Sequence, residues 1–170
     1  MGNDSLDNFS GNSTKTFKLS DGSYINAYII DSVGQEKYRR ISFISLKSAD
    51  SVFLVYDITS KSSLEELNDF SKAIKDRCEN DIVVMVLGNK TDLFLNTQVS
   101  SEQGKEFADL HHYYFMEISC FNKYDVYKAF QNIIEITFET RMKKDNLPIK
   151  NNFINLKKTN VIKEEKKSCC

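Results

Sequence analysis

The stretch SVFLVYDI at residues 51–58 is a nearly continuous apolar run of the length of one strand. Two similar runs follow it, IVVMVL at residues 82–87 and YYFMEI at residues 113–118. A strand that is apolar at successive positions, and not only at alternate ones, is typical of a parallel sheet with both faces covered. The three runs therefore predict the strands of a buried parallel sheet.

Helical segments separate these runs. The spacings Ser-x-x-Glu at residues 62–65 and Ser-x-x-Gln at residues 100–103 are typical of capping boxes, and predict helices to about residues 78 and 110. A last helix is predicted over about residues 123–143. Its apolar face comprises Val126, Phe130, Ile133, Ile134, Thr137 and Phe138. Alternating strands and helices predict a doubly wound α/β fold with helices on both faces of the sheet.

The chain before this unit is simpler. Residues 15–19 and 24–30 form two extended runs around Ser-Asp-Gly-Ser, which is a strong hairpin signal. Residues 1–14 are polar and predict a flexible N-terminus, and residues 35–48 predict a loop that leads into a short helix. We expect one domain over residues 15–144, followed by a tail over residues 145–170.

Composition narrows the class of protein. The chain has 170 residues, 41% of them hydrophobic, which is enough for one domain with a sizeable core. It has no apolar signal segment and no apolar window long enough to span a membrane, so we expect neither secretion nor a transmembrane helix. Its four cysteines lack the paired spacing of a zinc site.

Charge is unevenly distributed along the chain. From residue 141 to the end there are nine Lys or Arg and three Asp or Glu, a balance of +6, against −7 for the rest. A basic tail on an acidic body suits an anionic membrane surface. A solvated, disordered tail is the plain alternative. The last two residues, Cys169 and Cys170, favour lipid attachment, because two lipid chains anchor a protein stably where one is marginal.

Polar residues follow three of the predicted strands directly. Asp31, Asn89 and Ser119 each come just after a strand. In a parallel α/β sheet, ligands bind in the loops beyond the carboxyl ends of the strands. This placement predicts that the three residues share one pocket.

The first of these loops reads Asp-Ser-Val-Gly-Gln-Glu at residues 31–36. The carboxylate of Asp31 can hold Mg²⁺ through water, and the backbone N–H of Gly34 can approach a phosphate oxygen closely. Gln35 beside it can orient an attacking water. An ordinary loop that contains an Asp and a Gly is the competing interpretation.

The second loop, Asn-Lys-Thr-Asp at residues 89–92, is more specific. The carboxylate of Asp92 can accept hydrogen bonds from both N1–H and the exocyclic amine of guanine, a pair of donors that adenine lacks. Lys90 can lay its apolar stem along the base, while Asn89 braces neighbouring loops. Ser119 and Cys120 can offer a backbone N–H to guanine O6.

These motifs together resemble the Ras-like small GTPases, and specifically the Rab branch, over roughly residues 15–144. The segments that carry the resemblance are DSVGQE (31–36), LVYDIT (54–59), GNKTDL (88–93), EISC (117–120) and the terminal Cys-Cys. The resemblance implies a P-loop NTPase-like fold with a mostly parallel sheet. It also implies two geranylgeranyl chains on Cys169 and Cys170. Residues 81–99 are similar to the Golgi-type Rabs.

The chain departs from this family in one major respect. It contains no G-x-x-x-x-G-K-[S/T], so the family's first strand, phosphate-binding loop and first helix are missing. Smaller departures are Ile30, Ser32, Val33 and Phe121. In the family's sheet the missing strand lies between the strands at residues 24–30 and 51–58. We therefore expect these two to pair directly or to leave the sheet open, with a poorly stable chain as the cost.

The resemblance implies a GTP-hydrolysing switch in vesicle and membrane trafficking, here truncated or incomplete, with GTP or GDP and Mg²⁺ as ligands. Without the phosphate-binding loop we expect weak guanine-nucleotide binding and negligible turnover. Implied partners are effectors, an exchange factor, a GTPase-activating protein, the prenylation and escort machinery and a GDP dissociation inhibitor, with no nucleic acid. The implied location is the cytoplasmic face of the Golgi or of vesicles, in exchange with the cytosol.

Two other interpretations stay open. The first is a lipid-anchored, Rab-like adaptor that no longer switches, since the surface motifs remain while the phosphate loop is absent. A parallel-sheet domain of another class, phosphatase-like or response-regulator-like, is disfavoured because the sequence lacks a Cys-x₅-Arg loop and an acidic cluster.

Overall fold

The computed structural model describes residues 13–31, 46, 48–78 and 82–144. The elements in chain order are β1 (Ser13–Lys18), β2 (Tyr24–Ile29), β3 (Ser51–Asp57), α2 (Lys61–Arg77), β4 (Val83–Asn89), the 3₁₀ helix η2 (Thr91–Asn96), α3 (Ser101–Leu110), β5 (Tyr114–Glu117) and α4 (Lys123–Lys144). The apolar runs at residues 51–58, 82–87 and 113–118 thus correspond to β3, β4 and β5.

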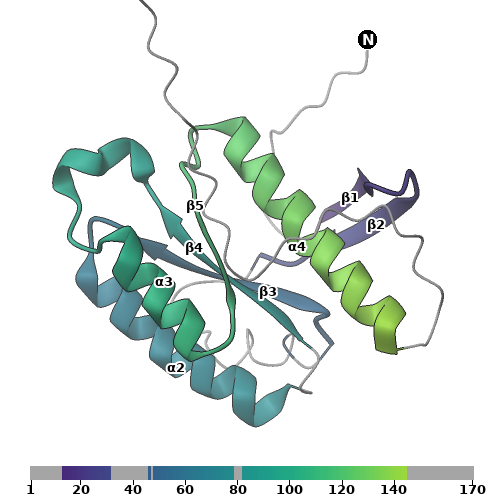
Figure 1. The fold of residues 1–170 in the computed structure, drawn as a ribbon, viewed down its shortest axis with the longest axis horizontal. Helices are drawn as coiled ribbons and strands as arrows, with labels where there is room; N and C mark the ends of the chain where they lie inside the picture. Colours follow the sequence, from purple (N-terminus) through teal and green to yellow (C-terminus); the bar gives the residue numbers. More distant parts are fainter. Residues whose placement is uncertain (1–12, 32–45, 47, 79–81, 145–170) are drawn as a thin grey trace, which may run out of the picture.

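A parallel sheet in the order β3-β4-β5 forms the centre of the structure. Helices α2 and α3 cover one face of this sheet, and α4 crosses the other face (Figure 1). The right-handed βαβ connections that a parallel sheet requires are supplied by these helices. The predicted fold class, an α/β sheet with helices on both faces, is confirmed.

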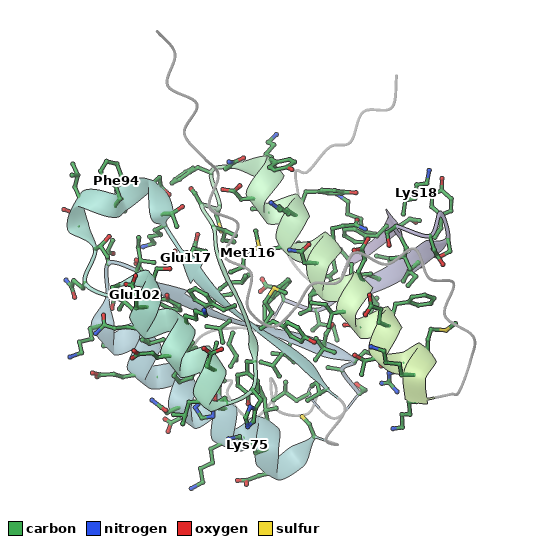
Figure 2. All side chains as sticks on the ribbon, viewed as in Figure 1. Lys18, Lys75, Phe94, Glu102, Met116 and Glu117 are labelled. Atoms are coloured by element: carbon green, nitrogen blue, oxygen red, sulfur yellow. The ribbon has the colours of Figure 1, made fainter. Side chains whose placement is uncertain are left out.

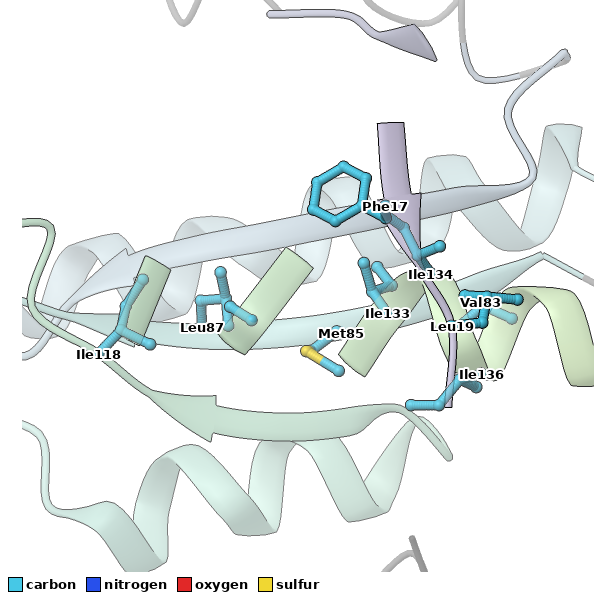
Figure 3. Packing of buried hydrophobic residues seen from close by; sticks show 10 residues of the cluster. Phe17, Leu19, Val83, Met85, Leu87, Ile118, Ile133, Ile134 and Ile136 are labelled. Carbon is cyan, nitrogen blue, oxygen red and sulfur yellow. The ribbon is translucent and has the colours of Figure 1, made fainter. Parts of the chain in front are cut away.

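Strand β4 contributes to a separate apolar core on each face of the sheet. Its residues Val83, Met85 and Leu87 pack under α4, and its residues Val84 and Val86 pack under α2 and α3. All five side chains are buried. Figure 3 shows the first of these cores, which extends along β4 to the hairpin. Burial on both faces explains why the strand sequences do not alternate.

Strands β1 and β2 form an antiparallel hairpin of their own, in register from Ser13 opposite Ile29 to Lys18 opposite Tyr24. Gly22 in its turn has φ +87°, a left-handed conformation that glycine adopts without strain. The carboxylate of Asp21 accepts hydrogen bonds from the backbone N–H of Ser23 at 2.8 Å and from its hydroxyl at 2.6 Å. The Asp-Gly signal in the sequence correctly predicts this turn.

The hairpin and the parallel sheet are two separate sheets. Among the described residues, β2 pairs only with β1 and β3 pairs only with β4. Of the two expected outcomes, direct pairing or an open sheet, the structure has the open sheet.

Side chains join the two sheets. Phe130 of α4 packs edge-on against Phe53 of β3, with ring centroids 5.1 Å apart, and stacks with Phe17 of β1 at 6.2 Å. The side chain of Gln131 also donates a hydrogen bond to the carbonyl of Lys18 at 2.7 Å. Among the described residues, the hairpin is therefore held by side chains of α4 and of the core that α4 covers, and no backbone pairing joins it to the parallel sheet.

Of the two predicted capping boxes, one is confirmed and one is wrong. The box at residues 100–103 is confirmed, because the Ser100 side chain and the Gln103 side chain each bond the other's backbone N–H. The box at residues 62–65 is wrong. Helix α2 begins at Lys61 with Ser60 as its N-cap residue, so Ser62 already lies in the first turn, and the side chain of Ser60 makes no capping hydrogen bond.

Two further points concern the sequence expectations. The 3₁₀ helix η2 lies where no regular element was expected. The expected loop and short helix at residues 35–48 and the expected flexible N-terminus fall largely outside the described residues.

Within the described residues, no helix combines the length and the apolar character needed to cross a membrane.

Candidate functional site

The candidate site is built at the carboxyl ends of β4 and β5. Asn89 is the last residue of β4. Strand β5 ends at Glu117, and Ser119 is the second residue after it. Backbone hydrogen bonds tie the two strand ends together, from Ile118 N–H to Gly88 O at 2.8 Å and from Thr91 N–H to Ile118 O at 3.3 Å. Two of the three residues that were expected to share a pocket therefore lie on adjoining loops.

Asp92 is oriented by a hydrogen bond across these loops. The hydroxyl of Ser119 donates to Asp92 Oδ1 at 2.5 Å, and accepts from the backbone N–H of Phe121 at 3.2 Å. Ser119 is only 6% exposed, whereas Asp92 is exposed. Each carboxylate oxygen has two lone pairs, so the carboxylate of Asp92 can accept further hydrogen bonds from a ligand. A buried hydroxyl thus positions an accessible carboxylate.

Asn89 connects three segments. Its side-chain Oδ1 accepts the backbone N–H of Cys120 at 3.1 Å, and its carbonyl accepts the N–H of Ile58 at 3.0 Å. The backbone N–H of Cys120, one of the two groups expected to be offered to guanine O6, therefore has an acceptor within the chain. Cys120 is exposed, whereas a free cysteine that packs as a small apolar residue is usually buried.

Lys90 has an unusual backbone. Its φ of 71° and ψ of 36° place it in the left-handed region, which side-chain-bearing residues seldom adopt. Its ammonium lies 2.6 Å from Asp57 Oδ2. The hydrogen bond and charge of Asp57 raise the pKa of Lys90. Burial alone would raise the pKa of Asp57, but hydrogen bonds from Lys90 and Thr59 outweigh it and lower that pKa.

An open hollow of about 540 Å³ lies beside these loops. Its lining residues are Thr91, Asp92, Ser119, Phe121, Asn122, Lys123 and Asp125. Pockets for small ligands usually measure about 300–1,000 Å³, so the hollow has room for a purine base. Asp92 and its partner Ser119 are the two sequence-predicted residues that line it.

Among the described residues, the predicted site residues Asp31, Asn89, Lys90 and Cys120 do not line this hollow. Asp31 is described and exposed. Gly34, Gln35, Cys169 and Cys170 lie outside the described residues. No group of three or more His, Cys, Asp or Glu that could hold a metal ion occurs among the residues the structure describes.

Sequence reasoning missed the role of Asp57. It is the last residue of β3, which pairs with β4, and its side chain reaches Lys90 in the loop at residues 89–92 that follows β4. A signal was present, since a carboxylate at the end of a buried parallel strand points toward the edge where ligand loops gather.

Taken together, the fold and the adjoining loops at the strand ends define a small-GTPase-like domain. Residues 8–139 match the family model "Ras family". The chain is 39% identical to "Ras-related protein Rab11E" of Lotus japonicus over 121 residues, which are 71% of this chain and 55% of that protein. It is 35% identical to "Ras-related protein RABA1b" of Arabidopsis thaliana over 131 residues, 77% of this chain and 60% of the relative.

A longer match reaches 92% of this chain and 76% of "Ras-related protein Rab2BV" of Beta vulgaris, at 31% identity. The chain therefore belongs to the Ras family, and its relatives place it with the Rab proteins. It spans about half the length of several of the curated relatives it matches.

Proposed function

We propose that this chain carries the guanine-recognition part of a Rab-type small GTPase that acts in intracellular membrane trafficking. The observation that carries the proposal is the 2.5 Å hydrogen bond from Ser119 to Asp92, next to a hollow of the size of a base. It presents an ordered carboxylate to the donor edge of guanine. Membership in the Ras family supports GTP and GDP as the ligands and GTP hydrolysis as the activity of the complete domain.

Discrimination between purines follows from the chemistry of Asp92. An ionised carboxylate only accepts hydrogen bonds, and guanine offers N1–H and the 2-amino group side by side. Adenine has neither donor at these positions. A bidentate base contact of this kind discriminates by about 1–3 kcal/mol, which is roughly 5- to 150-fold in affinity.

The phosphate half of the site sets the limits of the proposal. The sequence contains no Gly-rich phosphate loop, whose backbone N–H groups and lysine normally bind the β- and γ-phosphates. We therefore expect affinities weaker than micromolar and negligible turnover for these 170 residues alone. In a complete site, Gln35 would orient the attacking water, Gly34 N–H would contact the γ-phosphate, and Asp31 would hold Mg²⁺ through water.

The cellular role rests on the relatives and on the tail. Rab relatives support endomembrane association and the general set of effectors and regulators. The basic tail that ends in Cys169 and Cys170 suits a double lipid anchor on a cytoplasmic membrane face. A Golgi location, suggested by residues 81–99, stays a prediction.

The test compares GDP with ADP by calorimetry or by NMR titration. We expect GDP to bind at least about fivefold more tightly than ADP. Asp92→Asn should abolish this preference and favour xanthosine diphosphate, because an amide N–H₂ can donate to the 2-carbonyl of xanthine. Asp125→Asn is the matched control, since Asp125 lines the same hollow but has no part in base recognition. Equal affinities for GDP and ADP in the unmodified chain would refute the proposal.

The missing phosphate loop favours a second candidate function, a lipid-anchored Rab-like adaptor that does not switch. This candidate predicts membrane pelleting that depends on Cys169 and Cys170 and is the same with GDP, with a GTP analogue and with neither. Nucleotide-dependent partner binding would argue against it.

A further inference from the structure

The segment that follows β3 contacts the guanine loop at both of its ends. At the start of the loop, the N–H of Ile58 donates to the carbonyl of Asn89 at 3.0 Å. At its end, the carbonyl of Ile58 accepts the N–H groups of Gln98 and Val99, at 2.9 and 3.0 Å. Because one residue fixes both ends, residues 89–99 form a loop that is clamped to the end of β3.

The carboxylate of Asp57 adds a third contact, inside the loop. Its Oδ2 lies 2.6 Å from the ammonium of Lys90. Its Oδ1 accepts the N–H of Thr59 at 2.8 Å and the hydroxyl of Thr59 at 2.7 Å. The backbone N–H of Asp57 donates to the hydroxyl of Ser63, in the first turn of α2, at 2.9 Å. These bonds leave the carboxylate little rotational freedom.

Lys90 is the residue in the loop that most needs such a partner. A residue with a side chain in the left-handed region costs on the order of 1–2 kcal/mol relative to a right-handed backbone. Its side chain is also 47% exposed, so packing does little to restrain the long stem. An ion pair to a fixed carboxylate restrains both the stem and the backbone from which it extends.

We propose that Asp57 is a positioning residue for guanine binding, which holds the stem of Lys90 in place to cover one face of the base. This inference rests on the proposed function, because it concerns the same site. Neither Asp57 nor Lys90 lines the hollow, but Lys90 is two residues from Asp92, which does, and Asp57 acts only through Lys90. The loop is thereby linked to the start of α2 through Thr59 and Ser63.

Asp57→Asn is the informative change. The amide keeps an oxygen that can accept from Thr59, but it removes the charge that binds Lys90. The matched control is Asp50→Asn. Asp50 precedes β3 at its opposite end and forms an ion pair with Arg141, so this variant removes an equivalent charge pair far from the hollow.

We expect Asp57→Asn to weaken GDP binding about three- to fivefold in low salt, as for a partly exposed ion pair, and Asp50→Asn to leave it unchanged. The loss should shrink at high salt, because exposed charges are screened. Asp57→Glu should restore part of the affinity. In a Lys90→Met background, Asp57→Asn should have no further effect, whereas general damage to the fold would persist there.

Amide hydrogen exchange separates this inference from the proposed function. Asp57→Asn should accelerate exchange over residues 89–99, and Asp50→Asn should not, whether or not a nucleotide binds. If the unmodified chain shows no preference for GDP, the proposed function fails, and the exchange rates still test the contact. If Asp57→Asn matches Asp50→Asn in GDP affinity and in exchange, the positioning role is refuted.

Discussion

Replacing Phe17 by alanine tests whether side-chain packing holds the hairpin on the rest of the domain. Phe17 is only 2% exposed, and its ring stacks with Tyr127 at 6.1 Å and with Phe130 at 6.2 Å. Truncating a phenylalanine that is buried in a core to alanine costs about 3–5 kcal/mol of stability. This equals a factor of roughly 10² to 10³ or more in the equilibrium between docked and detached hairpin.

A two-stranded hairpin is at best marginally stable in water, so a detached hairpin also loses its own structure. Hydrogen exchange followed by mass spectrometry reads the two sheets separately. We expect Phe17→Ala to accelerate exchange across β1 and β2 by at least 100-fold. The amides of β3, β4 and β5 should change much less, because no backbone hydrogen bond joins these strands to the hairpin within the described residues.

Tyr28→Ala is the control for this experiment. Tyr28 lies on the same hairpin but is 62% exposed, so its removal should cost well under about 1 kcal/mol. Loss of protection in both sheets to the same extent would show that they unfold as one unit, and would refute the side-chain attachment described above. Protection of β1 and β2 that is unchanged in Phe17→Ala would refute it as well.

Three further predictions concern stability. Ser100→Ala should lower the free energy of unfolding by about 1 kcal/mol in denaturant titrations, while Ser62→Ala should change it by less than about 0.5 kcal/mol, because only the first serine caps a helix. Gly104→Ala should lower the melting temperature, at a cost of about 1–3 kcal/mol, because a Cβ there would lie 2.1 Å from the hydroxyl of buried Tyr56. Burial and neighbouring cations lower the pKa of His111, so below about pH 6.5 the unfolded chain binds more protons than the folded one. The free energy of unfolding should therefore fall as the pH drops through that range. His111→Gln should make melting curves less dependent on pH there.

Much of the central layer could be predicted from the sequence, because burial on both faces leaves a strong pattern. The runs that became β3, β4 and β5 contain few polar residues, and the Asp-Gly turn has few alternative conformations. Helix starts were less certain. Ser62 matches the capping-box spacing, but the backbone bonds around Ser60 start α2 earlier.

The site was predictable where neighbours in the chain carry it, and not where distant residues meet. The spacing from Asn89 to Asp92 is visible in the sequence, and so is the strand-end position of Ser119. The ion pair between Asp57 and Lys90 joins two strands that the sequence does not align, and the left-handed backbone of Lys90 has no glycine to announce it. The hydrogen bond that occupies the Cys120 amide depends on the same packing.

The attachment of the hairpin to α4 has a consequence during synthesis of the chain. Lys18 and Gln131, which join them, are 113 residues apart in the sequence. At translation rates of about 5–20 residues per second, Phe17 leaves the ribosome roughly 6–23 s before the helix that buries it. For that interval the hairpin lacks the helix that buries Phe17, and its apolar side chains are accessible to chaperones and proteases. We therefore expect the hairpin to be the part of the domain that is exposed longest during synthesis.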